Sequence, residues 1–195
     1  MTTTTANTED RVTGVALDLF GSQGYAVTSM EQVRRHAGVS NGSLYHLFPN
    51  KAALAARLHS NGMIQCQDGI IRAIEAASSA EKGVRAAIAF QTTWVDQHTQ
   101  LARLVYADMP DDVLVAAAPT LDGPSRKYVR VVDNWLGSHV DSGAIADRPF
   151  VVLHALWLGP TQEFCRHWLR GRGRLRPRHV ADQLAEGAWH ALVAR

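Results

Sequence analysis

The segment 41–48, which reads NGSLYHLF, carries hydrogen-bonding side chains at a spacing that places them on one side of a short helix. Leu44 and Phe48 are four residues apart and predict an inward apolar face. The residues left on the outer side are Asn41, Gly42, Ser43, Tyr45 and His46. An amide can bond adenine through two hydrogen bonds, a hydroxyl can bond a base edge or a phosphate, and a phenol can bond a phosphate oxygen. These side chains therefore suit the major groove of DNA.

Gly42 and Lys51 each allow two explanations. Glycine inside a helix costs about 1 kcal/mol relative to alanine, so Gly42 either lets the helix approach DNA closely or packs tightly on a neighbouring helix. Lys51 lies in the first turn of the next predicted helix, where free N–H groups and a cation together would bind a phosphate. The alternative for Lys51 is an ordinary solvated lysine.

Two short helices joined by a tight turn are predicted to position these side chains. Residues 28–31 read Thr-Ser-Met-Glu, the form of a capping box in which the Thr28 hydroxyl accepts from a first-turn N–H while Glu31 reaches back. Gly38 suits the left-handed residue that ends a helix, and Ser40 is a natural N-cap for the segment 41–48. The first helix is therefore expected from about Thr28 to Gly38.

Residues 11–58 resemble the N-terminal domain of the TetR family of bacterial transcriptional regulators. The residues that carry the resemblance are Phe20, Gly24, Tyr25, Thr28, Val33, Ala37, Gly38, Val39, Ser40, Gly42, Leu44, Tyr45, Phe48, Lys51 and Leu54. The resemblance implies a three-helix head that binds double-stranded operator DNA, with repression as the family default. The DNA contacts we expect are Thr28, Ser29, Arg35, Ser40, Asn41, Gly42, Ser43, Tyr45, His46 and Lys51.

Composition is that of an ordinary globular chain. Hydrophobic residues make up 46% of the 195 residues and charged residues 19%, and the formal net charge is only +2. Net charge alone does not suggest DNA, so local placement of the positive groups must matter. Residues 1–7 lack a basic start and an apolar core, so we expect a disordered tail and a cytoplasmic protein without a membrane span. Domain boundaries are expected at 8–58 for the DNA-binding head and 59–195 for a body.

The body is predicted to be helical, which makes the whole fold all-α. Apolar residues recur near a period of 3.6, and no strand pattern appears. Helix one is expected from about residue 9 to 22, and a long helix continues after Lys51 toward residue 78. The further expected helices are 81–99, 101–108, 111–118, 123–140, 149–170 and 178–194, with breaks at the proline-containing segments and a kink at Gly159-Pro160.

The last two predicted helices have the character of a homodimer interface. Apolar residues wrap nearly around the segment 149–170, so one face covers the core and another needs a partner. The candidate interface residues are Leu153, Leu156, Phe164, Trp168, Val180, Leu184, Ala188 and Leu192. Two such helices from each subunit would form the four-helix contact that the family uses. The alternative is a monomer in which these helices serve only as core.

Aromatic and polar residues of the body suggest a site for a small apolar or aromatic effector. The candidates are Phe90, Trp94, His98, Tyr106, Tyr128, Trp135, His154, Trp157 and Gln162. Apolar walls with a few hydrogen-bonding groups are typical of small-molecule sites. Each such residue on its own is more often packed core with its N–H group satisfied.

Other chemistry finds little support. Cys66 and Cys165 lack metal-ligand spacing and are interpreted as small core residues, with redox sensing as the alternative. The arginines of 166–178 are interpreted as a helix C-terminus followed by a solvated loop, rather than a second nucleic-acid patch. Phosphate-binding loops, catalytic motifs and metal sites are not recognisable, and no cofactor is expected. Cys165 and His167 stand two apart and would not face each other on a helix.

The sequence therefore predicts a homodimeric, ligand-responsive regulator that reads a pseudo-palindromic operator through successive major grooves, roughly 34 to 36 Å apart. Two rival functions remain open. One is a helical small-molecule binding protein that never binds specific DNA, and the other is a DNA-binding protein without an effector.

Overall fold

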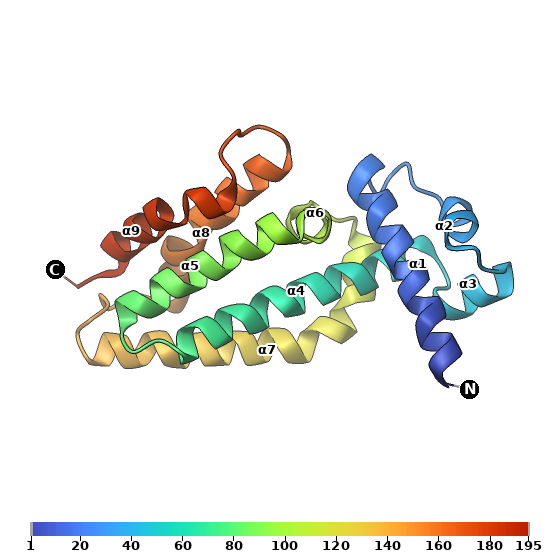
Figure 1. Ribbon diagram of the computed structural model, residues 1–195. Coiled ribbons are helices and arrows are strands. Elements are labelled where there is room, and N and C mark those ends of the chain that lie inside the picture. The colour runs from blue at the N-terminus through green and yellow to red at the C-terminus, as the bar shows by residue number, and fades with distance from the viewer. Residues whose placement is uncertain (1, 195) are drawn as a thin grey trace. The chain divides into compact units, whose positions relative to one another are not determined.

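A computed structural model describes residues 2–194 of the chain, with side chains from residue 7 onward, and every regular element in this range is a helix. The elements are α1 (Thr2–Gln23), α2 (Met30–Ala37), α3 (Asn41–Leu47), α4 (Lys51–Glu75), α5 (Ala80–Gln97), α6 (Thr99–Tyr106), α7 (Asp111–Asp141), α8 (Phe150–Leu169), the 3₁₀ turn η1 (Pro177–His179) and α9 (Ala181–Leu192) (Figure 1). The prediction of an all-α fold is confirmed.

Helix α1 begins earlier than its sequence suggests. We expected a disordered tail over residues 1–7 and a helix from residue 9, whereas the described part of that tail is helical from Thr2. Met1 lies outside the described residues. Extending an existing helix costs far less than starting one, because each added residue gains a hydrogen bond. The packed turns of α1 around Val12, Ala16 and Phe20 provide that start.

Helix α7 corrects the prediction of two helices over 111–118 and 123–140. It runs unbroken through Pro119 and Pro124. A proline removes one backbone hydrogen bond and crowds the preceding turn. Buried side chains on both sides of the prolines, Val113 and Ala117 before them and Tyr128 after them, hold the two halves in one helix.

The chain forms two compact units, and both α4 and α7 run from one unit into the other. The first unit comprises residues up to Met63 together with Thr99–Leu121, and the second comprises Ile64–His98 and Asp122–Arg195. The boundary expected at residue 58 therefore falls inside α4, and the first unit also takes in α6 and the start of α7.

The first unit has one hydrophobic core that draws on every one of its helices. Its members on α1 to α4 include Val12, Phe20, Val33, Leu44, Phe48, Leu54 and Leu58, and its members from the later segment are Leu104, Met109, Val113 and Ala117. Glycines allow α6 to lie close to its neighbours. A Cβ on Gly21 would come within 2.8 Å of Gln100 Cγ, and one on Gly62 within 2.5 Å of Val105 Cγ2.

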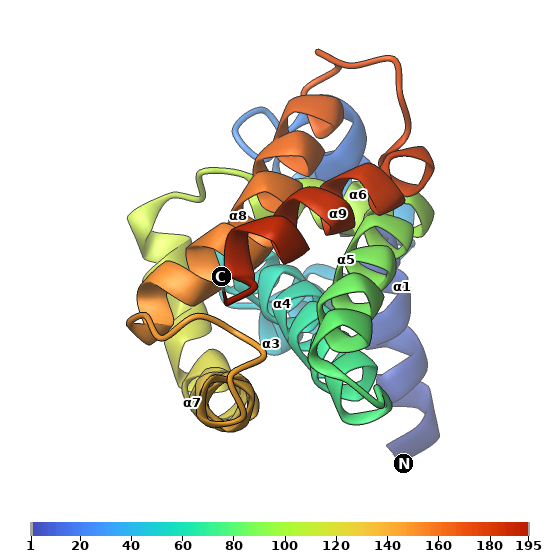
Figure 2. The same cartoon turned by 90° about the vertical axis from the view of Figure 1, so that its left-hand side faces the viewer.

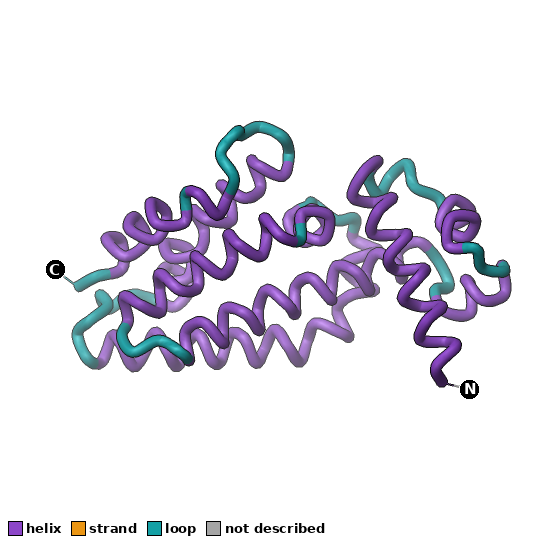
Figure 3. Tube along the Cα trace, in the orientation of Figure 1, coloured by secondary structure: helices purple, strands orange, loops and turns teal. Residues whose placement is uncertain are grey.

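The second unit is a helical bundle in which α9 packs on both α5 and α8 (Figure 2). Its core is aliphatic at α4 and α5, with Ile70, Ile74, Val84 and Ile88 buried. The loop that joins α8 to η1 (Figure 3) carries four arginines in residues 170–176, and η1 adds Arg178. Two of them reach Asp96, whose side chain is 1% exposed: Arg176 Nε lies 2.7 Å from Oδ1 and Arg178 Nε 3.2 Å from Oδ2.

Candidate DNA-binding surface and ligand-binding region

Hydrogen bonds at the helix ends fix the turn between α2 and α3. Gly38 ends α2 in the left-handed conformation (φ 61°), as predicted, and its N–H donates to the last carbonyls of the helix. Ser40 caps α3 by accepting from the Ser43 N–H at 3.1 Å. Val39 between them is buried in the core of the first unit. These local interactions hold α3 in one orientation on its neighbours.

The capping box of α2 lies one residue later than predicted. Ser29, rather than Thr28, accepts from the N–H of the third helical residue, Gln32, at 3.2 Å. The Gln32 side chain accepts in return from the Ser29 N–H at 2.7 Å. Thr28 is 1% exposed, and its hydroxyl donates to the Gly24 carbonyl at 2.8 Å. Because that hydroxyl is used inside the fold, Thr28 does not belong to the exposed surface on which it was expected.

The outer face of α3 is exposed in the pattern that the sequence predicts. Leu44 and Phe48 are buried, and the exposed residues are Asn41, Gly42, Ser43, Tyr45 and His46. Tyr45 is an exposed large side chain at 48%. Within residues 7–194, the side chains of Asn41, Tyr45 and His46 make no hydrogen bond, so their polar groups face only solvent. They are free to bond a partner.

Gly42 has no packing role in the described part of the chain. A Cβ added there would meet one atom within 4 Å, Ser40 Oγ at 3.9 Å. This is ordinary van der Waals contact, so the tight-packing explanation of Gly42 is wrong. A helical glycine with open space above it leaves the other explanation, close approach of an external partner.

Lys51 holds the loop between α1 and α2. Its ammonium donates to the carbonyls of Tyr25 at 2.9 Å and Ala26 at 3.2 Å, and it lies 4.4 Å from the centre of the Tyr25 ring. Lys51 is therefore not an ordinary solvated lysine, which was the alternative explanation. Two of its three N–H groups are used inside the fold, and one remains for a phosphate.

Ion pairs decide which positive groups of the first unit are available. Arg34 makes a two-fold contact with Glu31 at 2.8 and 2.7 Å, and Arg57 pairs with Glu9 at 2.8 Å. Arg35 is exposed, and no acidic group among residues 7–194 pairs with it. Arg35, beside the turn, thus contributes a positive charge that no ion pair of the described chain holds.

The expected ligand residues separate into two groups in the second unit. In one, the rings of Trp135 and Trp157 stack at 5.4 Å, and the Tyr128 hydroxyl lies 3.0 Å from His154 Nε2. In the other, Trp94 stacks on His98 at 5.5 Å. Phe90 lies close to Gly69 of α4, where a Cβ would come within 1.8 Å of the Phe90 ring. The sequence suggested one shared space, whereas these contacts describe separate groups, and a ligand-binding role for their members stays a prediction.

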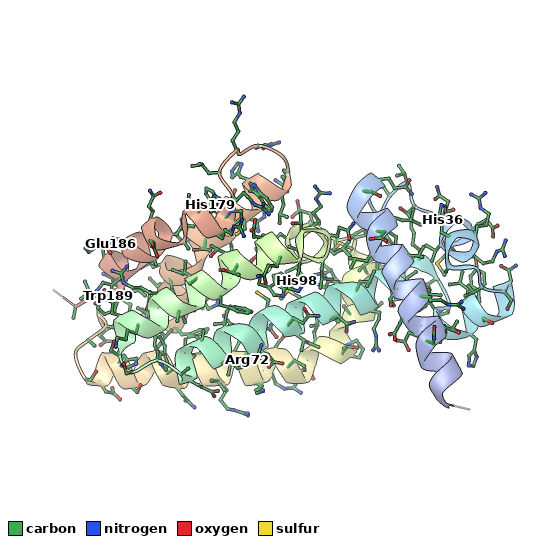
Figure 4. The ribbon with its side chains drawn as sticks, viewed as in Figure 1. His36, Arg72, His98, His179, Glu186 and Trp189 are labelled. Atoms are coloured by element: carbon green, nitrogen blue, oxygen red, sulfur yellow. The ribbon has the colours of Figure 1, made fainter. Side chains whose placement is uncertain are left out.

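Tyr106 and Gln162 belong to neither group, and His98 is an exposed member of the second. Tyr106 is on α6, which belongs to the first unit, whereas the members of both groups belong to the second. His98 is exposed at the end of α5, where Figure 4 labels it. Gln162 is half-buried on α8. A 3.6-residue period places side chains on a face, but it does not say which helices meet.

Cys66, which the sequence did not single out as a ligand contact, lies near Tyr128 and links it to two further such residues, Gln91 and Cys165. Cys66 and Cys165 are buried, and burial raises the pKa of each thiol to about 12. Cys66 also hydrogen-bonds Gln91. Burial raises the pKa of Tyr128 and of Cys165, and the Cys66 thiolate, once formed, raises both pKa values further, so these groups are near neighbours. High thiol pKa values favour the interpretation of both cysteines as core residues over redox sensing.

Thr161 completes this group. Its side chain is fully buried at 0% exposure, and its hydroxyl has no hydrogen-bond partner within the described chain. The signal in the sequence was its spacing, since Thr161 stands seven residues after His154 and four before Cys165 on α8.

The predicted interface residues divide between core and surface. Leu153, Val180, Ala188 and Leu192 are buried inside the protomer. Those four are corrected to core, because the second apolar face of α8 and α9 packs within the chain. Those left partly exposed are Leu156, Phe164, Trp168 and Leu184.

The described residues lack two features of other functional classes. None of the helices there is both long and apolar enough to span a bilayer. That same part of the chain has no cluster of three or more His, Cys, Asp or Glu side chains suited to a metal ion.

Known proteins share both the head and the fold. Residues 13–58 match the family model described as bacterial regulatory proteins, tetR family. No curated protein matches the sequence. A TetR family transcription regulator from Marinobacter aquaeolei VT8 has a similar structure, with a TM-score of 0.73, 16% identity and 100% of each chain covered.

Two further similar structures come from proteins whose names include a ligand class. FadR from Bacillus subtilis, solved in complex with stearoyl-CoA, has a TM-score of 0.77 at 17% identity and covers 93% of this chain and 97% of its own. The ketosteroid transcriptional regulator KstR2 of Mycobacterium tuberculosis has a TM-score of 0.74 at 15% identity, with coverage of 96% and 95%. At these identities the similarity shows a shared fold.

Proposed function

The chain belongs to the TetR family of bacterial regulatory proteins through its residues 13–58, and from this we propose that it is a homodimeric, ligand-responsive regulator that binds DNA through α3. The observation that carries the proposal is the exposed face of α3, on which Asn41, Tyr45 and His46 have no partner in the described chain. Gly42 beside them leaves room for a close approach to base edges.

Each residue of this face has a distinct role in the proposal. Asn41 is suited to adenine, because its amide can donate and accept at once. Ser43 and Tyr45 bond phosphate or base edges, and Arg35 adds a charge that attracts the DNA backbone. Two copies of α3 in a dimer would enter successive major grooves of a pseudo-palindromic operator, roughly 34 to 36 Å apart.

The test is fluorescence anisotropy with the DNA upstream of the gene, at several salt concentrations and with random competitor DNA. Asn41→Ala should change the preferred base at one position of each half-site and cost about 1 to 3 kcal/mol against the best sequence. Asn134→Ala, which removes an exposed amide on α7, is the matched control. Binding of equal strength to random and upstream DNA would refute a sequence-specific regulator and leave the helical ligand-binding protein.

The second copy is proposed to pack against the partly exposed faces of α8 and α9. Leu156 and Leu184 retain exposed apolar area there, and added Cβ atoms on Gly159 and Gly187 would meet nothing within 4 Å. Glycine weakens a helix by about 1 kcal/mol relative to alanine, and open glycines on neighbouring helices permit close approach of a partner helix.

Sedimentation velocity tests the dimer. Leu184→Glu should give monomers, because it places a charge inside the proposed contact. The matched control is Gln183→Glu, an exposed neighbour on α9. A Leu184→Glu protein that remains dimeric would place the contact elsewhere.

A small molecule bound by the second unit is proposed to alter DNA affinity. The named ligands of structurally similar proteins, stearoyl-CoA for FadR and the ketosteroid class for KstR2, have large apolar parts. Coupling of 1 to 3 kcal/mol between ligand and DNA would correspond to about 5- to 150-fold in affinity. We propose repression released by the effector, and α4, which runs through both units, is the proposed route of coupling.

A further inference from the structure

The second unit contains a set of buried and half-buried polar side chains, called here the polar core: Cys66, Gln91, Tyr128, His154, Thr161 and Cys165. They come from α4, α5, α7 and α8. Tyr128 and His154 are joined by a hydrogen bond of 3.0 Å, and Cys66 is joined to Gln91 in the same way. Polar groups are costly inside an apolar bundle, so a set of them calls for an explanation.

Thr161 lies between the two ends of this set. On α8 it stands seven residues after His154 and four before Cys165, so the three side chains share one face of the helix. Tyr128 ties the His154 end to α7, and Cys66 is close to both Tyr128 and Cys165. Helical spacing therefore places Thr161 on the face of α8 that carries His154 and Cys165.

The Thr161 hydroxyl has an unmet need for a hydrogen-bond partner. It is fully buried and has no hydrogen-bond partner in the described chain. A buried threonine on a helix can bond the carbonyl one turn earlier, as Thr92 on α5 does with Ile88 at 2.8 Å, but Thr161 makes no such bond on α8. A buried hydroxyl without a partner is destabilising, whereas an apolar group of the same shape would be tolerated. A ligand atom that bonds this hydroxyl would remove the penalty.

The polar core carries no charge at neutral pH. Burial raises the pKa of both thiols and of the Tyr128 hydroxyl, and it lowers the pKa of His154. Gln91 and Thr161 have no charge to lose. A carboxylate, phosphate or ammonium group placed here would lose its water without gaining an opposite charge, which is strongly unfavourable.

We infer that the polar core is the contact site for an uncharged ligand, or for the uncharged part of a larger one, whose hydroxyl or carbonyl group bonds the Thr161 hydroxyl. This inference rests on the proposed ligand-responsive function and narrows the class of effector. A charged group on the effector must remain outside the polar core.

The probes are three ten-carbon chains that differ in head group: 1-decanol, decanoate and decylammonium. Thermal unfolding of the full-length protein at pH 7.5 measures binding, because a ligand of the folded state raises the melting temperature by mass action. We expect 1-decanol to raise the melting temperature more than either ion. Equal stabilisation by decanoate or decylammonium, or no stabilisation by any of the three, overturns the inference.

Thr161→Val removes the hydroxyl and keeps the shape. Without ligand, this variant should melt about 2 to 6 °C higher, because it lacks the unsatisfied group. Its affinity for 1-decanol should fall by about three- to tenfold, the value of one neutral hydrogen bond. Thr92→Val is the matched control, since its hydroxyl is also buried but bonded to Ile88. It should melt lower than the unaltered protein and keep its preference for 1-decanol.

A Thr161→Val protein that keeps the full preference for 1-decanol also overturns the inference. DNA titration of the same preparations separates this failure from failure of the proposed function. Specific DNA binding without any preference for 1-decanol refutes only the ligand class. Preference for 1-decanol without specific DNA binding refutes the regulator and leaves the ligand site intact.

Discussion

Lys51 is expected to stabilise the first unit, and Lys51→Met measures by how much. Methionine keeps the unbranched stem and removes the ammonium, together with its bonds of 2.9 and 3.2 Å to the Tyr25 and Ala26 carbonyls. A hydrogen bond to a charged group contributes about 1.5 to 3 kcal/mol when it is well buried. Lys51 is only partly buried and Ala26 is exposed, so water replaces part of what is lost. Adding the contact with the Tyr25 ring, worth about 0.5 kcal/mol at such a site, we expect a loss of about 2 kcal/mol.

The assay must observe the first unit separately. The five tryptophans, Trp94, Trp135, Trp157, Trp168 and Trp189, all belong to the second unit, so tryptophan fluorescence follows that unit alone. Hydrogen exchange of peptides that cover residues 24–60 reports on the first unit. Lys51→Met should speed exchange in those peptides by about 30-fold, the equivalent of 2 kcal/mol, with little change in fluorescence-detected unfolding. Lys82→Met is the matched control, because the Lys82 ammonium donates one hydrogen bond, to the Ser78 hydroxyl, on an exposed surface.

Exchange in residues 24–60 that is unchanged within a factor of two would refute the stabilising role of Lys51. The same variant tests the phosphate contact expected from the sequence by a separate measurement. If the remaining N–H group of Lys51 bonds a phosphate, the salt dependence of DNA binding should flatten by about one unit. A stability loss with an unchanged salt slope would make Lys51 a positioning residue only.

Three further predictions concern single side chains. Gly42→Ala should raise the stability of the first unit by up to about 1 kcal/mol, since its Cβ meets open space, and weaken specific DNA binding; unaltered DNA affinity in anisotropy would dismiss close approach. Asp96→Asn should lower the free energy of unfolding by about 2 kcal/mol, because half-exposed Arg176 and Arg178 lose their ion pairs with a buried carboxylate. Urea unfolding followed by tryptophan fluorescence measures this loss, and a loss below about 0.5 kcal/mol, the value of an exposed pair, would contradict it. Burial lowers the pKa of His154 in the folded state, so the unfolded chain takes up the proton first and stability falls as the pH drops below about 6.5. His154→Asn should lessen that fall between pH 7.5 and 5.5, and an equal fall in both proteins would count against it.

Local signals in the sequence were sufficient for the helix-turn-helix segment. Gly38 and Ser40 end and start helices through bonds to residues within a few positions, and Leu44 and Phe48 lie on the inner face by spacing alone. The misplaced capping box shows the limit of such signals. Thr28 and Ser29 are adjacent, and the sequence pattern alone allows either hydroxyl to be the N-cap. The loop geometry decides between them, because it places the Thr28 hydroxyl within hydrogen-bond distance of the Gly24 carbonyl.

Questions that depend on which helices meet could not be answered in this way. Apolar residues on two faces of α8 do not reveal that Leu153 faces the core while Leu156 stays partly exposed. The polar core joins residues separated by up to 99 positions, from Cys66 to Cys165, and no periodicity connects them. Pro119 suggested a break in α7, yet packing on both sides of it keeps the helix whole.

The composition of the first unit has a consequence for the order of events during synthesis. Its core takes Leu104, Met109, Val113 and Ala117 from a segment that emerges long after α3. Chains grow at about 5 to 20 residues per second, so the nascent head waits several seconds with part of its apolar surface uncovered. A ribosome-bound chain stopped at residue 63 should therefore be sensitive to protease, and one stopped well beyond Leu121 should resist it. The first unit therefore cannot complete its fold before the second unit begins to be synthesised, because residues 99–121 of the first unit follow residues 64–98 of the second along the chain.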